Sequence, residues 1–297
     1  MKDTPSLWQG EGPEPNPVVR IIAIRTAQTT ALTAPVLVSL AIFLPPSGFW
    51  RVIPWIGGLV SAGLSAYFGA TFHARSPLFS WLSGKNGEFL SRLPPSEGDV
   101  VAVTFDDGPH PETTPRLLDL LAEAQVTATF FLVGERVSRY PKIVRRIADE
   151  GHTIGLHGLH HRTMVLQSAS EIRADLGEAR RRVEQATGKA LPTPLLLRPP
   201  YGFKTPILGR VAARLGCRIV AWSVDPRDYD EVTAATLVKR VAEKVAPGSI
   251  VLLHERPGAG TSVEALPRLL ALFQERGLRC ARIGENAARS ARKVNPR

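Results

Sequence analysis

The sequence predicts an α/β protein in which a parallel strand–helix barrel of modest size follows an N-terminal hairpin of two transmembrane helices. Between residues 98 and 285, strand-like and helix-like segments alternate, which is typical of a parallel sheet with helices between its strands. Before residue 74, two apolar runs are each long enough to cross about 30 Å of hydrocarbon. We therefore expect a membrane-attached segment followed by one large domain.

The N-terminal part begins with residues 1–20, whose proline, glycine and charge predict a disordered leader. The apolar runs are Thr26–Leu44 and Val52–Phe72, and Pro45–Gly48 breaks the chain between them. We expect two transmembrane helices within residues 21–73. A cleaved signal peptide and a buried soluble hairpin are the alternatives, but no small-residue cleavage site is evident and a second span follows the first.

The orientation of this hairpin follows from its flanking charges. Arg20 and Arg25 precede the first run, Arg75 and Lys85 follow the second, and the short loop between the runs holds only Arg51. The positive-inside rule then places both ends, and with them the large domain, in the cytoplasm. If only the second run inserts, the domain lies on the periplasmic or extracellular side.

The elements of the large domain follow a connector at residues 74–97. Apolar, β-branched runs predict strands at 99–105, 127–133, 153–157, 194–198, 217–224, 248–254 and 278–283. Helical periodicity predicts helices at 113–124, 141–150, 170–187, 205–215, 232–246 and 262–276. Glycines directly after several helical runs are expected to end them. Residues 286–297 are expected to be a solvated basic tail.

The composition narrows the class of partner. The formal net charge of +10 and the pI of about 10.1 favour anionic surfaces, phosphorylated substrates or acidic lipid. No nucleic-acid-binding module is recognisable and the basic residues are spread along the chain, so we expect no nucleic acid partner. Cys217 and Cys280 lie in apolar runs and are expected to be buried thiols, with a single disulfide as the alternative. The sequence contains no pattern that predicts an oligomeric state.

Two adjacent carboxylates, Asp106 and Asp107, stand where the first strand of the domain ends. Gly108 and Pro109 turn the chain directly after them. Neighbouring side chains at a strand end point in different directions, so one carboxylate is able to face a metal ion while the other faces a substrate. A solvated Asp-Asp-Gly turn is the alternative for this tripeptide alone.

A pair of histidines, His157 and His161, follows the strand at 153–157. One helical turn would direct both imidazoles at a single ion. Together with a carboxylate from another strand end, they supply two nitrogens and one oxygen and leave positions open for water, as a catalytic metal requires. His160 and His152 are not expected to be ligands. A surface histidine cluster is the alternative.

Three further polar clusters each lie at the end of another predicted strand. In the first, the prolines of Arg198–Gly202 stiffen a loop and allow the backbone N–H of Tyr201 to act as an oxyanion donor. The others are Asp225–Tyr229 and Val251–His254. Any one of these clusters is explained by a structural loop, but five clusters at five strand ends indicate a single active site.

The motifs TFDDGP, HGLHH, RPPYG, DPRDY and LLH, in this order, resemble the NodB-type polysaccharide deacetylases of carbohydrate esterase family 4. The resemblance covers nearly two thirds of the chain and assigns residues 98–285 to a NodB homology domain. It implies a distorted (β/α)7-type barrel, a divalent metal ion that is commonly zinc, and hydrolysis of an N-acetyl group on an amino sugar. The neighbouring domains in this division are 1–20, 21–73, 74–97 and 286–297.

The resemblance also implies a role for each matching residue. Asp106 would be the catalytic base and His254 the acid, while Asp107, His157 and His161 would hold the metal. Residues that would position these groups or contact the substrate are Arg198 beside Asp106, Asp228 beside His254, Tyr201 with its oxyanion N–H, and Tyr229, Leu252 and Pro200 in the substrate-binding wall.

Two positions depart from the family pattern. Gly158 stands where a serine or threonine is usual, which removes a hydroxyl able to brace the loop, and Tyr229 replaces a common tryptophan. Neither change removes a catalytic group, so we expect an active enzyme that deacetylates a polysaccharide or a polyprenyl-phosphate-linked amino sugar. The alternatives are a deformylase or amidase acting on another amide, and an inactive membrane-anchored glycan-binding protein.

Overall fold

The structure is a computed structural model, and it describes residues 63, 89–165, 167–230, 232–255 and 260–284. Its strands are β1 (Phe89–Leu90), β2 (Val100–Gly108), β3 (Thr129–Leu132), β4 (Thr153–Leu156), β5 (Leu195–Leu197), β6 (Cys217–Val220), β7 (Ser249–His254) and β8 (Arg279–Cys280). Its helices are α4 (Thr113–Glu123), α5 (Gly134–Arg139), α6 (Pro141–Asp149), α7 (Ala169–Thr187), α8 (Pro206–Arg214), α9 (Ala234–Ala242) and α10 (Gly260–Glu275), with 3₁₀ turns η1 (Pro95–Glu97) and η2 (Pro200–Gly202).

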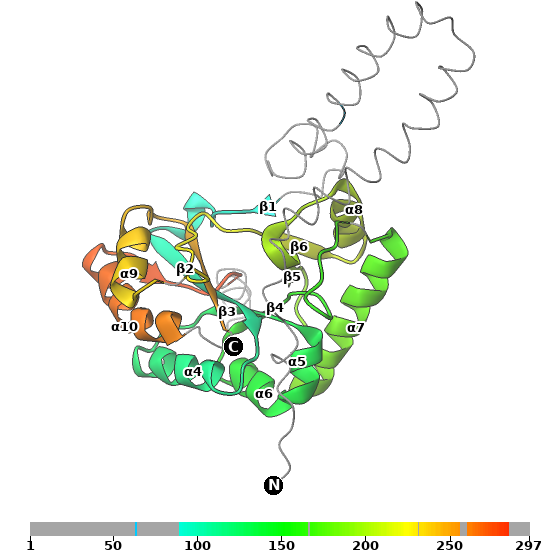
Figure 1. The fold of residues 1–297 in the computed structure, drawn as a ribbon, viewed down its shortest axis with the longest axis horizontal. Coiled ribbons are helices and arrows are strands. Elements are labelled where there is room, and N and C mark those ends of the chain that lie inside the picture. The colour runs from blue at the N-terminus through cyan, green and yellow to red at the C-terminus, as the bar shows by residue number, and fades with distance from the viewer. Residues whose placement is uncertain (1–62, 64–88, 166, 231, 256–259, 285–297) are drawn as a thin grey trace, which may run out of the picture. The chain divides into compact units, whose positions relative to one another are not determined.

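The strands form one parallel sheet that the helices surround (Figure 1). Its order is β1-β6-β5-β4-β3-β2-β7, and β8 pairs with β2. The predicted parallel α/β layout is thus confirmed. All seven expected strands and all six expected helices of the domain are present, with ends shifted by a few residues.

The sheet closes on itself through the segment that follows β6. Strand β6 ends at Val220, four residues earlier than expected, but Val224 forms a parallel bridge with Val251 of β7. The backbone N–H of Leu252 donates to the carbonyl of Val224 at 3.0 Å. Because an irregular segment rather than a full strand makes this closure, the barrel is distorted.

Two elements lie outside the sequence-based expectations. Strand β1 falls in the stretch expected to be a connector, yet it pairs with β6, so the domain begins before residue 98. Helix α5 begins two residues after β3 ends and spans only six residues. A segment this short gives little helical periodicity in the sequence, which explains why it was missed.

The core has two layers whose side chains alternate along each strand. On β2, Val101, Val103 and Phe105 pack with residues of the helices, whereas Val100 and Ala102 pack inside the barrel with other strand residues. Side chains on one face of a strand are two residues apart. The polar residues that continue the inward-facing series at the strand ends are Thr104 and Asp106 on β2, Arg198 after β5, and His254 on β7.

The expectations for the two ends of the chain fall outside the described residues, apart from residue 63. They are the leader at 1–20, the two transmembrane helices at 21–73, the first part of the connector and the basic tail at 286–297. Among the helices that the structure describes, none combines the length and apolarity needed to cross a bilayer. The transmembrane hairpin therefore remains a prediction.

Candidate metal centre and active site

A buried ion pair lies near the C-terminal end of β2. Arg198 is completely buried, and its Nη1 donates to Asp106 Oδ1 at 2.6 Å and to Thr104 Oγ1 at 2.8 Å. Its Nη2 donates to the carbonyl of Ala221 at 3.0 Å, and the guanidinium lies 4.1 Å from the ring centroid of Phe131. A buried charge pair is tolerated when such hydrogen bonds saturate it. The pair therefore fixes Asp106 Oδ1 and leaves Oδ2 for other contacts.

Asp107 points away from this pair because the strand is irregular at its end. The register of β2 against β3 shifts between Phe105 and Gly108, and Asp107 adopts a left-handed backbone with φ 71°. The guanidinium of Arg136 donates to the backbone carbonyl of Asp107 and holds this turn. The adjacent carboxylates thus point in different directions, Asp106 toward Arg198 and Asp107 toward the histidines, as the sequence predicted.

The segment His157–His161, which we call the histidine loop, brings two imidazoles to Asp107. The Oδ1 atom of Asp107 lies 3.0 Å from His161 Nε2 and 3.4 Å from His157 Nε2. One ligand atom from each of the three residues lies within 4.8 Å of the others. Asp107 lies 50 and 54 positions before the two histidines in the sequence. The structure brings all three side chains together.

This trio fits a divalent cation. Asp107 Oδ1 is buried, and no hydrogen bond of acceptable geometry reaches it despite the two nearby imidazoles. The Nδ1 atom of His157 lies 2.7 Å from the carbonyl of Arg198, an acceptor, so Nδ1 carries the proton and Nε2 presents its lone pair to the trio. Burial alone would raise the pKa of Asp107, but the imidazoles of His161 and His157 hold it well below its usual range. Two imidazole nitrogens and one carboxylate suit a catalytic zinc ion.

His254 lies directly beside the catalytic-base candidate. Asp106 and His254 are partners in the register of β2 and β7, so the two side chains project from the same face of neighbouring strands. The Nδ1 atom of His254 lies 2.6 Å from Asp228 Oδ1, and its backbone N–H donates to Asp228 Oδ2 at 2.7 Å. Burial would lower the pKa of His254, but Asp228, with Asp107 and Asp106, raises it to about 9. An imidazole held this way keeps a proton at neutral pH.

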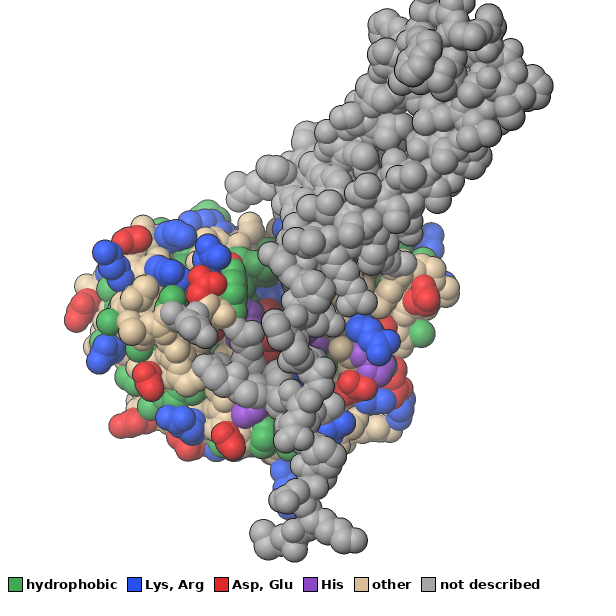
Figure 2. Space-filling view, in the orientation of Figure 1, with side chains coloured by type: hydrophobic (Ala, Val, Ile, Leu, Met, Phe, Trp, Pro, Cys, Tyr) green, Lys and Arg blue, Asp and Glu red, His purple; other side chains and the backbone are tan. Residues whose placement is uncertain are grey.

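Two exposed tyrosines flank the candidate site. Tyr201 and Tyr229 are 39% and 43% exposed, which is high for large aromatic side chains. The ring centroid of Tyr201 lies 4.8 Å from that of His161, and Tyr229 meets His254 edge-on at 5.7 Å. In Figure 2, histidine and acidic side chains gather near the middle of this face, whereas lysines and arginines are scattered around it. Pro200 and Leu252, the other expected wall residues, are buried.

Residues with a strained backbone are concentrated around the same site. Of the five described non-glycine residues with positive φ, Asp107, His161 and Tyr201 are expected site residues, and Arg227 precedes Asp228. Each such residue costs about 1–3 kcal/mol and persists only where the surrounding structure imposes it. This concentration of strain supports a functional role for the site.

Several contributing residues were not found from the sequence. Ser262 of α10 donates to Asp228 Oδ2 at 2.6 Å, and Asp175 of α7 accepts a hydrogen bond from the histidine loop. Glu255 is completely buried, accepts from the hydroxyl of Thr114, and has its pKa raised to about 8 by burial. A Cβ at Gly108 would lie 1.9 Å from Glu255 Oε1, so a side chain at residue 108 would displace this carboxylate. These contacts join distant segments, and no local motif marks them.

Two further histidines, His160 and His152, make separate contacts. His160 Nδ1 lies 2.6 Å from Glu135 Oε1, and His152 Nδ1 accepts from the backbone N–H of Ala128 at 3.0 Å. Neither belongs to the cluster formed by Asp107, His157 and His161.

Comparison with known proteins places this site in a family. The family model for polysaccharide deacetylase matches residues 94–220. A peptidoglycan-N-acetylglucosamine deacetylase of Bacillus cereus is 37% identical over 203 residues, which cover 68% of this chain and 72% of that protein. A chitooligosaccharide deacetylase of Bradyrhizobium is 36% identical over 197 residues, covering 61% of this chain and 89% of that protein.

Solved structures show the same fold. The crystal structure of a peptidoglycan N-acetylglucosamine deacetylase is 34% identical, has a TM-score of 0.65, and is matched over 71% of this chain and 96% of that one. A pseudoenzyme of carbohydrate esterase family 4 from Bacillus anthracis is 30% identical with a TM-score of 0.60, over 66% and 67% of the two chains. The chain therefore belongs to the polysaccharide deacetylases, with the NodB-type fold of carbohydrate esterase family 4.

Proposed function

We propose that this protein is a metal-dependent deacetylase that hydrolyses the N-acetyl group of an amino sugar in a polysaccharide or a lipid-linked glycan and releases acetate. The observation that carries the proposal is the proximity of an Asp106–Arg198 pair, an Asp228–His254 pair and a trio of metal-ligand side chains in one site. The relatives named above, which deacetylate peptidoglycan and chitooligosaccharides, support the reaction class.

Asp107, His157 and His161 would hold the cation, most simply Zn²⁺. When bound, such a cation supplies Lewis acidity for the amide carbonyl and lowers the pKa of a water molecule from about 15.7 toward 7. Asp106 takes the proton from the attacking water, because its Oδ1 is occupied by Arg198 while its Oδ2, 3.8 Å from His157 Nε2, faces the trio. Arg198 keeps this carboxylate oriented.

The later half of the reaction needs a proton donor. An amide nitrogen does not leave as an anion at neutral pH, so a group must protonate it as the C–N bond breaks. His254, whose pKa is raised to about 9, carries that proton, and Asp228 holds its ring in place. The backbone N–H of Tyr201, in a left-handed turn stiffened by Pro199 and Pro200, donates to the oxyanion.

The exposed rings of Tyr201 and Tyr229 would contact the sugar together with Pro200, and Tyr229 and Leu252 would line the acetyl pocket. A tyrosine at 229 is narrower than the tryptophan expected from the family pattern, which suits a wider groove. An N-acetylated glycan is the substrate class that this arrangement favours.

The location of the substrate depends on the N-terminal hairpin. We propose two membrane spans within residues 21–73 with the catalytic domain on the cytoplasmic side, where a polyprenyl-phosphate-linked amino sugar is accessible to a basic domain. A periplasmic or extracellular domain would instead meet peptidoglycan or exported polysaccharide. Protease accessibility of the domain in sealed membrane vesicles distinguishes the two orientations.

Acetate release tests the reaction itself. The full chain, supplied with Zn²⁺, is incubated with N-acetylglucosamine oligomers and with N-formylated and unrelated amides, and acetate and formate are measured. We expect acetate from the N-acetylated sugar and loss of activity when a chelator removes the metal. Formate as the main product would favour the deformylase alternative, and no product from any of the amides would favour an inactive glycan-binding protein.

A further inference from the structure

The histidine loop is fixed from outside by two helices. At one side, the first backbone N–H groups of α5 donate to it: Gly134 N–H to the carbonyl of Gly158 at 3.0 Å, and Glu135 N–H to that of Leu159 at 2.9 Å. At the other side, the N–H of Leu159 donates to Asp175 Oδ1 of α7 at 2.9 Å. The backbone N–H and the carbonyl of Leu159, which lies between the two ligand histidines, are therefore both hydrogen-bonded to helices.

The loop needs this support because its own backbone is strained. His161 has φ 52°, a left-handed conformation that a side chain makes costly by about 1–3 kcal/mol. Gly158, with φ 77°, carries no side chain that would brace the loop from within. A Cβ at Gly158 would lie 3.5 Å from Asp175 Oδ1, so the carboxylate of α7 reaches the side of the loop where a side chain would project.

Packing at the loop leaves little room for another arrangement. A Cβ at Gly134 would lie 2.8 Å from the side chain of Leu159 and 3.1 Å from the backbone of Ala179 on α7. The start of α5, the histidine loop and α7 thus meet in close contact. Burial raises the pKa of Asp175, and the hydrogen bond from the Leu159 N–H opposes this shift. The carboxylate is therefore partly desolvated where it binds the loop.

We propose that Asp175 is a positioning residue of the metal centre: its carboxylate, through the N–H of Leu159, holds the histidine loop so that His157 and His161 both face Asp107. This inference rests on the proposed function. Hydrogen-bonded groups behind metal ligands typically change metal affinity by about 10- to 100-fold when removed. Asp175 acts one step further out, through the backbone, so we expect the lower part of that range.

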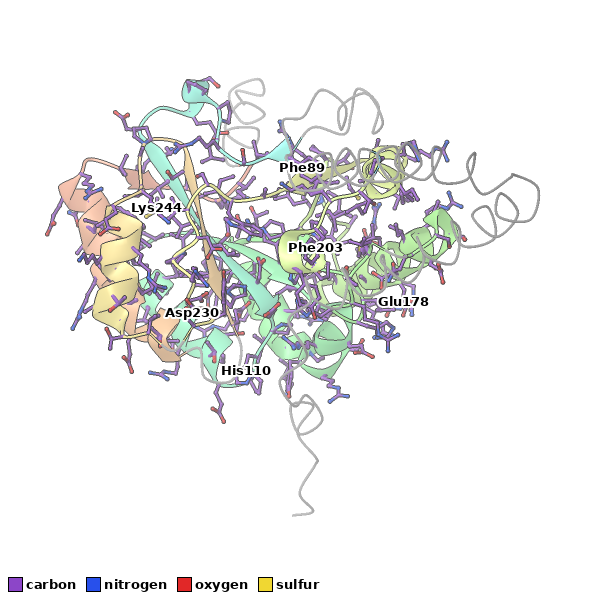
Figure 3. All side chains as sticks on the ribbon, turned by 45° about the horizontal axis from the view of Figure 1, so that its top comes forward. Phe89, His110, Glu178, Phe203, Asp230 and Lys244 are labelled. Atoms are coloured by element: carbon purple, nitrogen blue, oxygen red, sulfur yellow. The ribbon has the colours of Figure 1, made fainter. Side chains whose placement is uncertain are left out.

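Zinc affinity of the full chain, measured by competition with a chromophoric chelator, tests the proposal without relying on turnover. We expect D175A to bind Zn²⁺ about tenfold more weakly than the unaltered chain. D175N keeps an oxygen acceptor in the same place and should lose less. E178A is the matched control: Glu178 lies on the outer side of α7 (Figure 3) and pairs with Arg181 and Arg182. Its zinc affinity should stay unchanged.

Amide hydrogen exchange of the metal-free protein separates the brace from the metal. D175A should increase the exchange rate of the Leu159 N–H, and D175N should increase it less. Unchanged exchange at Leu159 together with unchanged zinc affinity in D175A overturns the proposal, as does equal weakening in E178A. If the unaltered chain binds no zinc, the proposed function fails, whereas faster exchange at Leu159 in D175A still supports the brace itself.

Discussion

The two sides of the candidate site are held by different means. On the strand side, Asp106 and His254 project from neighbouring strands in register, and buried side chains, chiefly Arg198 and Asp228, fix them. On the loop side, His157 and His161 belong to a loop whose strained backbone is held by hydrogen bonds to helices. The strand side is preformed by the sheet, whereas the loop side depends on packing around it and on the cation it is proposed to hold.

This difference predicts that the two sides fail separately. Changes of Asp106 or His254 should reduce turnover and leave zinc affinity nearly intact. Asp107, which also lies on β2, belongs with the metal ligands. Changes on the loop side should reduce zinc affinity first. Arg198 connects the sides, because its side chain holds Asp106 while its carbonyl holds His157 Nδ1.

The largest effect is expected from D106N, which removes the base and keeps the shape of the side chain. Deacetylation should fall by about 100-fold or more, since general base catalysis contributes this much. Zinc affinity should change little, because Asp106 is not one of the three clustered ligands. Steady-state acetate release and chelator competition on the same sample measure the two quantities. Near-normal turnover would refute the role of Asp106.

Removing the arginine side chain should reduce folding stability as well as activity. R198M leaves the Asp106 carboxylate buried without its partner, which typically costs about 3–5 kcal/mol. The carbonyl that holds His157 remains. Denaturant unfolding measures the loss, with R214M at the exposed end of α8 as a control. Equal stability of R198M and the unaltered chain would show that the buried pair is not needed for folding.

The pH dependence should identify His254 as the acid. Its pKa is raised to about 9, so the protonated form predominates below that value and is lost as pH rises through it. D228N removes the first of the groups that raise this pKa, and burial then lowers it. The alkaline limb of kcat/KM should therefore move to lower pH in D228N. The same alkaline limb in both enzymes would exclude His254 as the group that titrates.

A smaller effect is expected at the groove wall. Tyr229 is 43% exposed, and its hydroxyl donates to Asp225 Oδ2 at 3.1 Å, outside the metal trio. Y229A should raise KM for sugar oligomers by roughly 5- to 10-fold, since an aromatic contact is worth about 1 kcal/mol, and Y229W should restore it. A selective fall in kcat would contradict a purely binding role.

The sequence predicted the parts of the site that are local. It predicted that the neighbouring carboxylates Asp106 and Asp107 point in different directions and that each motif lies at a strand end. It did not predict β1 or α5, because two and six residues give too little periodicity. Ser262, Glu255 and Asp175 were missed because their roles arise from contacts between helices or strand ends far apart in the chain.

The most direct test of this account is zinc binding by the full chain and by two substitutions, H161A and D106N. We predict one tightly bound zinc ion in the unaltered chain, a marked loss of affinity in H161A, and nearly unchanged affinity in D106N. Equal zinc binding by H161A and the unaltered chain would contradict a metal centre formed by Asp107, His157 and His161.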